Sequence, residues 1–392
     1  MKVYIAACGM GLGHASRCLK LAERLRSMGA DVVFSTYGDA SRLVRSEGFK
    51  VLDAPKLTYL LDQEGGVDFK LTLAKGAPEL LTFIRQVAFE ARQLMAERPS
   101  VVLSDSRLST IVASRALEVP SILLLNQVKV VIPRRRPLGR LGREVKRGVE
   151  RLGCEVLSLG WSMAWEVLIA DFPPPYTISR ANLELPARLR GKVRLVGPLI
   201  DVDRLSVRGA EDKEAAKEAL GLGGRPLILL LAGGLEGERA VLLRLMLRAL
   251  RGRRDVNVLA SMSTPGREVY VRSGSVTVVG WIGDRATALK AADVLVTHGG
   301  HTSIAEAIYA ATPMLIVPTP GHTERMNNAL TAQRLGVARV VGEGGVEEVR
   351  EALDELLEDR GYSHRALSLA REVARFRAVE EVCREVASLA GQ

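Results

Sequence analysis

The strongest constraint on the fold is a repeated alternation of short apolar runs with amphipathic helical stretches, which occurs in both halves of the chain. In the first half we expect strands at residues 2–8, 31–35, 101–105, 121–125, 167–172 and 194–199, and helices at 18–28 and 109–117. In the second half we expect strands at 227–232, 256–261, 276–281, 294–297 and 314–318, and helices at 211–220 and 240–250. Strands that alternate with helices in this way form parallel sheets covered on both faces.

The pattern predicts an α/β protein of two doubly wound, Rossmann-like domains that face a ligand cleft. The length of 392 residues suits two or three domains. We place the boundary near residue 200, which gives domains 1–199 and 200–392. The tail 366–389 reads as one largely unbroken helix that could pack on either domain, and we include it in the second.

A basic segment at residues 129–165 departs from this pattern. Its first 23 residues hold nine basic and two acidic side chains, in a chain whose net charge is +10. Apolar residues interleave with the charges, and two tryptophans follow at 161 and 165. Such a segment suits an anionic membrane surface, although a solvated basic helix is the simpler alternative. The residues expected to contact the membrane are Arg134, Arg135, Arg136, Arg140 and Arg143. A nucleic-acid partner is disfavoured, because the sequence has no recognition motif and contains few aromatic residues on which bases could stack.

The rest of the composition bears on localisation. No run reaches the ~18 apolar residues of a spanning helix, and the first apolar run ends at glycines and a histidine, unlike a signal peptide. The four cysteines are scattered, which disfavours a disulfide frame or a zinc site. We therefore expect a cytoplasmic protein that is peripheral on the cytoplasmic face of the cell membrane.

A glycine-rich loop with a histidine follows the first strand. Gly9, Gly11 and Gly13 lead to His14, where the dinucleotide fingerprint G-x-G-x-x-G would require a glycine, so NAD or FAD is disfavoured. A helix N-terminus keeps an imidazole neutral, so His14 is a candidate general base. The alternative is a histidine that caps or packs the turn.

Asp105 is the candidate partner of this histidine. It ends a strand that should lie beside the first, and strand ends on that edge converge. Its carboxylate would accept a hydrogen bond from the ring nitrogen that faces away from the substrate. The alternative role for Asp105 is the N-cap of the helix at 109–117.

The second half contains a stronger signal, again between a strand and a helix. Gly299 and Gly300 expose backbone N–H groups, hydroxyl donors follow, and the helix dipole favours an anion, which together predict a diphosphate site. The side chains that would contribute are His298 or His301 as a donor to phosphate, Thr302 and Ser303 as hydroxyl donors, and Glu306 as an acceptor for the ribose hydroxyls. The pair Ser303 and Glu306 also has the spacing of a capping box, which is the competing explanation.

Two further loops should lie at the same edge. Gly233 and Gly234 follow one strand, and a polar loop after another strand carries His322, Glu324 and Arg325, which would hold a sugar. Trp281 would stack on a base, or else pack in the core.

Residues 278–335, which include GWIGDRATALKAADVLVTHGGHTSIAEAIYAATPMLIVPTPGHTERMNNA, closely resemble the donor-binding region of GT-B glycosyltransferases. The resemblance covers both the UDP-glucuronosyl and plant UDP-glycosyltransferases and the bacterial N-acetylglucosaminyltransferases that make lipid II, a group of the glycosyltransferase family 28 type. The N-terminal GMGLGH resembles the acceptor-side loop of the same families. The sequence Thr323-Glu324-Arg325-Met326-Asn327 departs from the pattern of many relatives, which leaves the sugar open.

The resemblance implies roles for the residues already named. His298, Thr302 and Ser303 would hold the diphosphate of a UDP-sugar, Glu306 the ribose, Trp281 or Ile282 the uracil, and Glu324 and Arg325 the transferred sugar. His14 would be the catalytic base and Asp105 its partner. The reaction would be a single displacement with inversion, and no metal or other cofactor would be required. The one D-x-D sequence, Asp201-Val202-Asp203, falls in the expected linker.

The implied activity is transfer of N-acetylglucosamine from a UDP-sugar to a polyprenyl- or dolichyl-(pyro)phosphate-linked acceptor. The nearest functional parallel is the archaeal type of lipid-linked N-glycan assembly, in which N-acetylglucosamine is added to a lipid-linked N-acetylglucosamine. Three alternatives remain open: a soluble UDP-glycosyltransferase acting on a small metabolite, a UDP-N-acetylglucosamine 2-epimerase, and a non-catalytic subunit that binds a nucleotide sugar.

Overall fold

A computed structural model describes residues 1–9, 12–56, 76–126, 128, 139–234, 236–264, 270–342 and 345–391. The chain forms two compact units. Unit 1 consists of Met1–Pro173, Ala181–Ile200 and Arg377–Gln392, and unit 2 consists of Pro174–Arg180 and Asp201–Phe376. No helix within the described ranges combines the length and the apolar character needed to cross a membrane.

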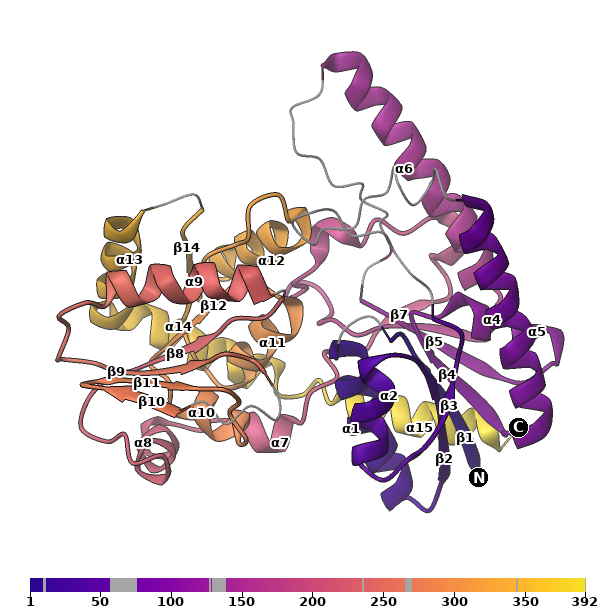
Figure 1. The fold of residues 1–392 in the computed structure, drawn as a ribbon, viewed down its shortest axis with the longest axis horizontal. Helices are drawn as coiled ribbons and strands as arrows, with labels where there is room; N and C mark the ends of the chain where they lie inside the picture. Colours follow the sequence, from indigo (N-terminus) through magenta and orange to yellow (C-terminus); the bar gives the residue numbers. More distant parts are fainter. Residues whose placement is uncertain are drawn as a thin grey trace. The chain divides into compact units, whose positions relative to one another are not determined.

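The described strands of unit 1 form one parallel sheet in the order β3-β2-β1-β4-β5-β6-β7 (Figure 1). The strands are β1 (Lys2–Ala7), β2 (Asp31–Thr36), β3 (Lys50–Asp53), β4 (Val101–Asp105), β5 (Ser121–Leu125), β6 (Glu166–Ile169) and β7 (Val193–Leu195). The order reverses between β1 and β4, where the two neighbouring carboxyl ends create the usual ligand position of a doubly wound sheet.

Helices cover both faces of this sheet, because five consecutive residues of β1 are buried and successive side chains of a strand point to opposite faces. Val3 and Ile5 of β1 pack in one cluster with α1 and α15, whereas Tyr4 and Ala6 pack in another with α4 and α5. The helices of unit 1 are α1 (Gly13–Ser27), α2 (Asp39–Ser46), α4 (Gly76–Glu97), α5 (Leu108–Ala116), α6 (Arg140–Trp161) and α15 (Ala378–Ala390), with short 3₁₀ turns at Arg180–Asn182 and Ala187–Leu189.

Unit 2 has a second sheet, in the order β10-β11-β9-β8-β12-β13-β14 among the described strands. The strands are β8 (Leu227–Leu231), β9 (Asn257–Ser261), β10 (Tyr270–Ser273), β11 (Val276–Val279), β12 (Val294–Thr297), β13 (Met314–Ile316) and β14 (Ala338–Val340). All described pairs are parallel except β10 with β11, and the order reverses between β8 and β12. The carboxyl ends of β8 and β12 therefore mark the ligand position of this unit.

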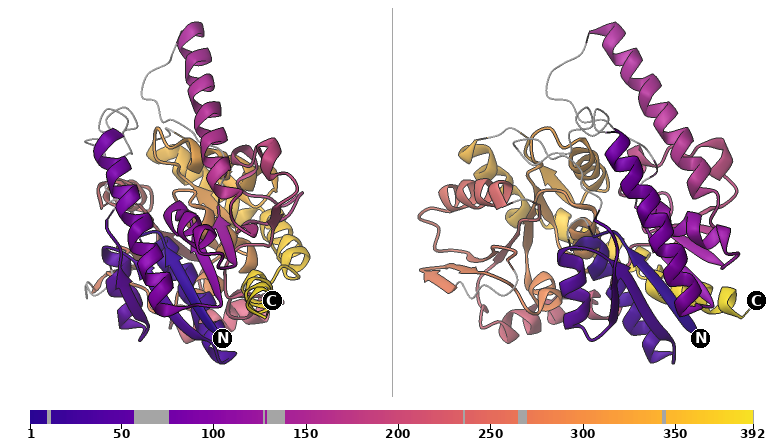
Figure 2. Two further views of the ribbon diagram at one scale, coloured as in Figure 1. Left: turned by 90° about the vertical axis from the view of Figure 1, so that its right-hand side faces the viewer. Right: turned by 45° about the vertical axis from the view of Figure 1, so that its right-hand side comes forward.

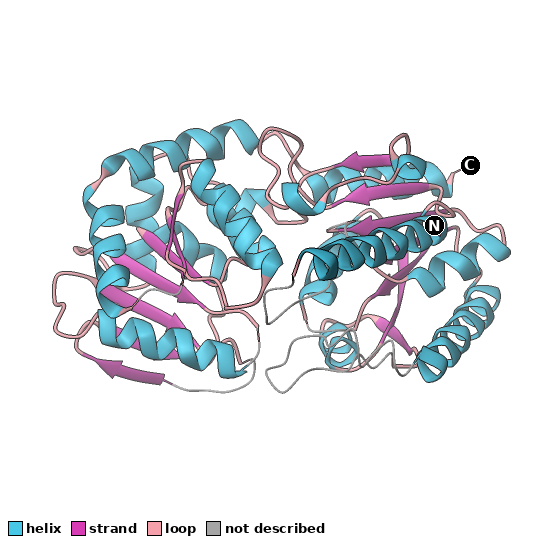
Figure 3. Cartoon of the chain, turned by 90° about the horizontal axis from the view of Figure 1, so that it is seen from above, coloured by secondary structure: helices cyan, strands magenta, loops and turns pink. Residues whose placement is uncertain are grey.

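Helices flank the sheet of unit 2, as the secondary-structure colouring of Figure 3 shows. They are α7 (Val202–Leu205), α8 (Ala210–Ala219), α9 (Glu236–Ala249), α10 (Arg285–Ala291), α11 (His301–Tyr309), α12 (Thr323–Arg334), α13 (Val346–Glu358) and α14 (Arg360–Val373). The predicted fold class, an α/β protein with two doubly wound sheets, is confirmed.

The C-terminal tail differs from its prediction in two ways. It is broken into α14 and α15, and α15 belongs to unit 1 rather than to the second domain of 200–392. The physical reason is that Val382, Cys383 and Val386 of α15 complete the apolar cluster around Cys18 and Leu21 of α1. An amphipathic helix buries its apolar face on whichever partner fits it, and sequence periodicity does not identify that partner.

Candidate active site

In unit 1, His14 and Asp105 meet at the carboxyl ends of β1 and β4. Ala7 at the end of β1 pairs with Asp105, so α1, which starts at Gly13, begins beside the carboxylate. His14 Nδ1 lies 2.9 Å from Asp105 Oδ1, and the Asp105 side chain is fully buried while a quarter of His14 is exposed. Asp105 does not cap α5, whose N-cap is Arg107. The pair therefore has the geometry of an oriented imidazole with Nε2 left over for a substrate.

Two residues that the sequence analysis did not single out complete this cluster. Arg17 binds both oxygens of Asp105 through Nε and Nη2, and its Nη1 donates to the side-chain oxygen of Asn126. Burial raises the pKa of Asp105, but the charges of Arg17 and His14 outweigh burial and hold that pKa well below its usual range. The sequence spacing of His14 and Arg17 could have indicated this contact, because residues three apart on a helix lie on one face.

In unit 2, the loop after β12 presents His298 and two glycines. His298 Nδ1 lies 3.0 Å from the carbonyl oxygen of Val317, whereas its buried Nε2 has no hydrogen-bond partner among the described residues. Burial lowers the pKa of His298, and the charge of Arg325 lowers it further. Gly299 has a φ of +87°, and a Cβ there would lie 2.8 Å from the backbone oxygen of Arg325, so only glycine fits.

The capping box expected from Ser303 and Glu306 does not form. Helix α11 begins at His301, its N-cap is Gly300, and no side chain caps it. Arg285 contacts both residues instead, with Nε 2.8 Å from Glu306 Oε2 and Nη2 3.2 Å from Ser303 Oγ. The largely buried Glu306 is thus held as an oriented carboxylate beside the start of α11.

A buried carboxylate that was not predicted, Glu238 of α9, joins the other loops of this edge. His322 Nε2 lies 3.0 Å from Glu238 Oε1, and Arg325 Nη1 lies 3.1 Å from Glu238 Oε2. Arg325 also donates to Thr319 Oγ1 at 2.6 Å. Gly234 has a φ of +99°, a backbone conformation that favours glycine, and a Cβ there would have to displace the Glu238 carboxylate. The loops after β8, β12 and β13 therefore meet around one cluster of charges.

The remaining predicted residues divide by exposure. Trp281 is 50% exposed, which excludes core packing. Ile282 and Ser303 are half-buried and His301 is buried, whereas Gly233, Thr302 and Glu324 are exposed. Gly13 starts α1, and Arg140 and Arg143 are exposed on α6. Gly11, Arg134, Arg135 and Arg136 lie outside the described residues.

Among the described residues, no group of three or more His, Cys, Asp or Glu side chains has the arrangement of a metal site. Within the D-x-D sequence, Asp201 caps α7 by accepting from the backbone N–H of Arg204 at 3.2 Å. This carboxylate therefore has a local structural role.

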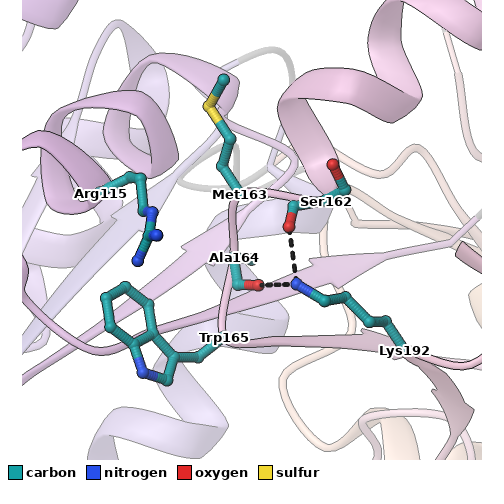
Figure 4. A pocket seen from close by; sticks show the side chains of 6 residues that line it. All are labelled: Arg115, Ser162, Met163, Ala164, Trp165 and Lys192. Atoms are coloured by element: carbon teal, nitrogen blue, oxygen red, sulfur yellow. Dashed lines mark hydrogen bonds between the residues drawn. The ribbon is translucent and has the colours of Figure 1, made fainter. Parts of the chain in front are cut away.

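Unit 1 also has a pocket at the opposite edge of its sheet, where β6 and β7 begin (Figure 4). The pocket has a volume of about 240 Å³ and is lined by Arg115, Ser162, Met163, Ala164, Trp165 and Lys192. Lys192 Nζ donates to the carbonyl oxygens of Ser162 and Ala164 at 2.8 and 3.2 Å, and Arg115 lies over the Trp165 ring. These contacts close the C-terminal end of α6 and explain the polar lining.

Comparison with known proteins identifies the class. Residues 258–379 match the glycosyltransferase family 28 C-terminal domain. An uncharacterized glycosyltransferase of Methanosarcina mazei is 29% identical over 95% of this chain and 94% of its own. A Deinococcus deserti protein, a UDP-N-acetylglucosamine–N-acetylmuramyl-(pentapeptide) pyrophosphoryl-undecaprenol N-acetylglucosamine transferase, is 24% identical over 89% of this chain and 88% of its own. The structure of the spinosyn forosaminyltransferase SpnP covers all of both chains with a TM-score of 0.68 and 18% identity.

The fold and these similarities define a GT-B glycosyltransferase, and the chain is an enzyme that transfers a glycosyl group. More particularly, its residues 258–379 match the family 28 C-terminal domain, and it is similar over most of its length to archaeal glycosyltransferases and to a lipid II N-acetylglucosaminyltransferase. The resemblance inferred from residues 278–335 is confirmed.

Proposed function

We propose that the protein is an inverting glycosyltransferase that moves N-acetylglucosamine from UDP-N-acetylglucosamine to a lipid-linked polyprenyl- or dolichyl-(pyro)phosphate acceptor. The observation that carries the proposal is the His14–Asp105 pair at the carboxyl ends of β1 and β4. The printed activity of the Deinococcus deserti relative supports the choice of donor and of acceptor class.

In the proposed reaction, Asp105 accepts a hydrogen bond from the Nδ1–H of His14, so that Nε2 carries the lone pair of a general base. Nε2 takes the proton of the acceptor hydroxyl while that oxygen bonds to the anomeric carbon of the donor. The bond between the anomeric carbon and the β-phosphate oxygen breaks at the same time. UDP leaves with the electron pair, and the configuration inverts.

We assign the UDP group to the edge of unit 2 built by His298, Gly300 and the first turn of α11. Backbone N–H groups and the helix dipole at this turn favour a diphosphate and stabilise the charge that grows on the leaving group. We assign the ribose hydroxyls to the carboxylate of Glu306, which Arg285 orients, and the uracil to the exposed face of Trp281. The proposed reaction uses no metal ion.

The acceptor class is supported by the exposed face of α6. This helix extends away from the sheet of unit 1 in both views of Figure 2. Its large apolar side chains recur at helical spacing and are 43–79% exposed; they are Leu141, Val145, Val149, Leu152, Val156 and Leu159. Arginines at 140, 143, 147 and 151 are exposed on the same helix. An exposed apolar stripe with flanking cations suits an anionic membrane surface, as expected of a peripheral protein on the cytoplasmic face.

An assay with a panel of UDP-sugars and polyprenyl-pyrophosphate acceptors, with and without EDTA, tests the activity. We expect transfer from UDP-N-acetylglucosamine that EDTA does not reduce. His14→Ala should lower kcat by at least ~100-fold, the usual scale for loss of a general base. The matched control is His364→Ala, whose side chain is exposed on α14, and this variant should keep full activity. Turnover of a small soluble acceptor alone, or release of N-acetylmannosamine and UDP without acceptor, would contradict the proposed acceptor or the transfer itself.

Vesicle co-sedimentation tests the membrane contact. Wild-type protein should bind vesicles that contain anionic lipid and release at high salt, and the double variant Leu141→Ser/Leu152→Ser should bind far more weakly. Exchange of Val241, which is 59% exposed on α9 of unit 2, for serine is the control and should leave binding unchanged. If the α6 variant instead changes only the oligomeric state by size-exclusion chromatography, the stripe is a contact between copies and the membrane assignment is wrong.

A further inference from the structure

We propose that Arg285 is a positioning residue that couples the ribose and phosphate contacts of the nucleotide site in unit 2. It leaves one oxygen of Glu306 for a ribose hydroxyl, and it makes the hydroxyl of Ser303 a donor to phosphate. The inference rests on the proposed assignment of UDP to the start of α11, and it deepens that assignment by naming the side chain that sets the polarity of both contacts.

Arg285 reaches α11 from the start of a neighbouring helix. It is the first residue of α10, whose N-cap Asp284 accepts from the backbone N–H and the hydroxyl of Thr287 at 3.1 and 2.7 Å. These bonds fix the turn from which the Arg285 side chain extends. On α11, Ser303 and Glu306 are one helical turn apart and therefore lie on one face of the helix. A single guanidinium can consequently contact both side chains.

The guanidinium contacts only one oxygen of the Glu306 carboxylate. Nε and Nη2 of Arg285 lie 2.8 and 2.7 Å from Oε2, whereas no hydrogen bond or ion pair from the described residues reaches Oε1. The exposed pair of Arg253 and Asp255 differs, because there Nε and Nη2 each hold a different carboxylate oxygen, at 2.8 and 2.6 Å. Oε1 of Glu306 is also not enclosed by the protein. It is therefore a free acceptor that a ribose hydroxyl can use.

The remaining contact of the guanidinium fixes the role of Ser303. Arg285 Nη2 lies 3.2 Å from Ser303 Oγ, and a guanidinium only donates, so Oγ is the acceptor in this contact. The serine hydroxyl has one proton, for which the described part of the chain supplies no acceptor. The positive guanidinium repels this proton, which therefore points away from Arg285. Ser303 is thus held as a donor, as the oxygens of a phosphate require.

Charge explains why this site needs an arginine. A lone carboxylate at Glu306 would repel a diphosphate bound one helical turn away, because like charges destabilise each other. Arg285 balances that carboxylate before UDP binds. The two side chains are 35% and 10% exposed, so water and salt screen them less than they screen a pair on the open surface. The ribose acceptor and the phosphate site can therefore share one helix.

The same contacts tie the proposed uracil site to α11. Trp281 lies four residues before Arg285 in the connection from β11 to α10, and half of its side chain is exposed. The link from Arg285 to Glu306 anchors this connection to α11. The groups assigned to the base, the ribose and the phosphate are therefore held together by one arginine.

Two ratios of binding constants, measured by calorimetry, test the proposal. The ribose discrimination is the Kd of 2′-deoxy-UDP or 3′-deoxy-UDP, whichever binds more weakly, divided by the Kd of UDP. The phosphate increment is the Kd of uridine divided by the Kd of UDP. Glu306→Gln should lower only the ribose discrimination, and Ser303→Ala only the phosphate increment, each by roughly 10-fold, the scale of a hydrogen bond to a charged group. Arg285→Met should lower both.

Two further variants separate geometry from charge and from general damage. Arg285→Lys keeps the charge but replaces the planar fork with a single ammonium group, so its ribose discrimination should stay low. Arg339→Met is the matched control, because Arg339 forms an exposed pair with Glu355 at 2.8 Å in the same unit. Both ratios in this control should equal those of the wild type.

Wild-type ratios in a folded Arg285→Met protein would overturn the inference, as would full recovery of both ratios in Arg285→Lys. The lysine variant retains a cation beside Glu306, so the test stays decisive if Arg285→Met does not fold. A wild type that binds UDP without any ribose discrimination would overturn the inference without a variant.

The two ratios need no turnover, which separates this inference from the proposed function. The expected pattern of ratios in a protein that transfers no sugar would defeat the proposed function and leave the role of Arg285 standing. Sugar transfer by a protein whose ratios do not respond to Arg285→Met would do the reverse.

Discussion

His298, which follows β12, donates a hydrogen bond from Nδ1 to the carbonyl oxygen of Val317, which follows β13; the two atoms are 3.0 Å apart. A carbonyl oxygen only accepts, so the neutral ring carries its lone pair on Nε2, the buried atom that has no partner among the described residues. Nε2 can therefore donate to a phosphate oxygen only after the ring takes up a proton. Burial lowers the pKa of His298, so the free protein holds the ring neutral near pH 7.

The first prediction is that UDP binding takes up a proton. An adjacent diphosphate favours the imidazolium and raises the pKa of His298, so protons are bound at every pH between the free and the bound values. The affinity for UDP should accordingly increase as the pH falls toward the pKa of His298 in the free protein. Calorimetry in two buffers of different ionisation enthalpy measures the uptake.

The control for this prediction is the same substitution at a different histidine. The uptake should disappear in His298→Gln and persist in His364→Gln, whose side chain is exposed on α14. Binding without any proton uptake in the wild type would mean that Nε2 accepts from a hydroxyl group, and the assignment of His298 to the diphosphate would then fail.

The second prediction separates two adjacent glycines. Gly299→Ala places a side chain at a φ of +87° and against the backbone of Arg325, so unit 2 should be destabilised by at least ~1–2 kcal/mol. Gly300→Ala meets no atom within 4 Å and should leave Tm unchanged. Its new methyl group nevertheless points into the space assigned to the diphosphate, so UDP affinity should fall roughly 10-fold, the usual scale of a steric misfit. Thermal unfolding and UDP titration of both variants are the measurements. Full UDP affinity in a stable Gly300→Ala protein would place the nucleotide elsewhere.

The third prediction concerns the ribose. Glu306→Gln removes a charged acceptor, which is worth ~1.5–3 kcal/mol per hydrogen bond, so UDP should bind roughly 10- to 150-fold more weakly. Wild type should discriminate against 2′-deoxy-UDP, and the variant should lose much of that discrimination. Glu324→Gln serves as the control, because Glu324 is exposed and should not change the affinity for UDP. Equal discrimination in wild type and Glu306→Gln would remove Glu306 from the ribose contact.

The fourth prediction concerns stability. Arg107 and Glu90 form a buried ion pair beneath the sheet of unit 1, and Glu90 also accepts from Tyr4 and Ser35, each at 2.7 Å. Arg107→Met leaves a buried carboxylate without its cation and should cost ~3–5 kcal/mol of unfolding free energy. Arg147→Met breaks an exposed pair with Glu144 and should cost less than ~1 kcal/mol. Urea denaturation compares the two, and similar losses would contradict the prediction.

Buried parallel strands were the most predictable part of the fold. The observed bounds of β4 and β5 coincide with those predicted, because a strand covered on both faces is a continuous apolar run. The antiparallel strand β10 was missed, since all four of its residues are exposed and leave no apolar pattern. The packing partner of α15 could not be identified from the sequence, because its apolar face fits either unit in principle.

The candidate site divides in the same way. His14, Asp105, His298 and Glu306 were found because each lies at the carboxyl end of a predicted strand or in the loop or helix that follows it. Arg285 and Glu238 were missed because their contacts depend on how loops approach one another in space, across sequence separations of 21 and 87 residues. Arg17 was within reach of sequence reasoning, since it lies one helical turn after His14.

The placement of α15 has a consequence for how the protein is made. On the ribosome, the apolar side of α1 stays uncovered until the whole of unit 2 has been synthesised, because α15, the helix that covers it, follows unit 2 in the chain. At ~5–20 residues per second, synthesis from the end of α1 at Ser27 to the start of α15 at Ala378 takes roughly 20–70 s. During that time the nascent N-terminal part exposes an apolar surface to which chaperones can bind. A chain that ends before Arg377 would lack α15 and would leave this surface uncovered.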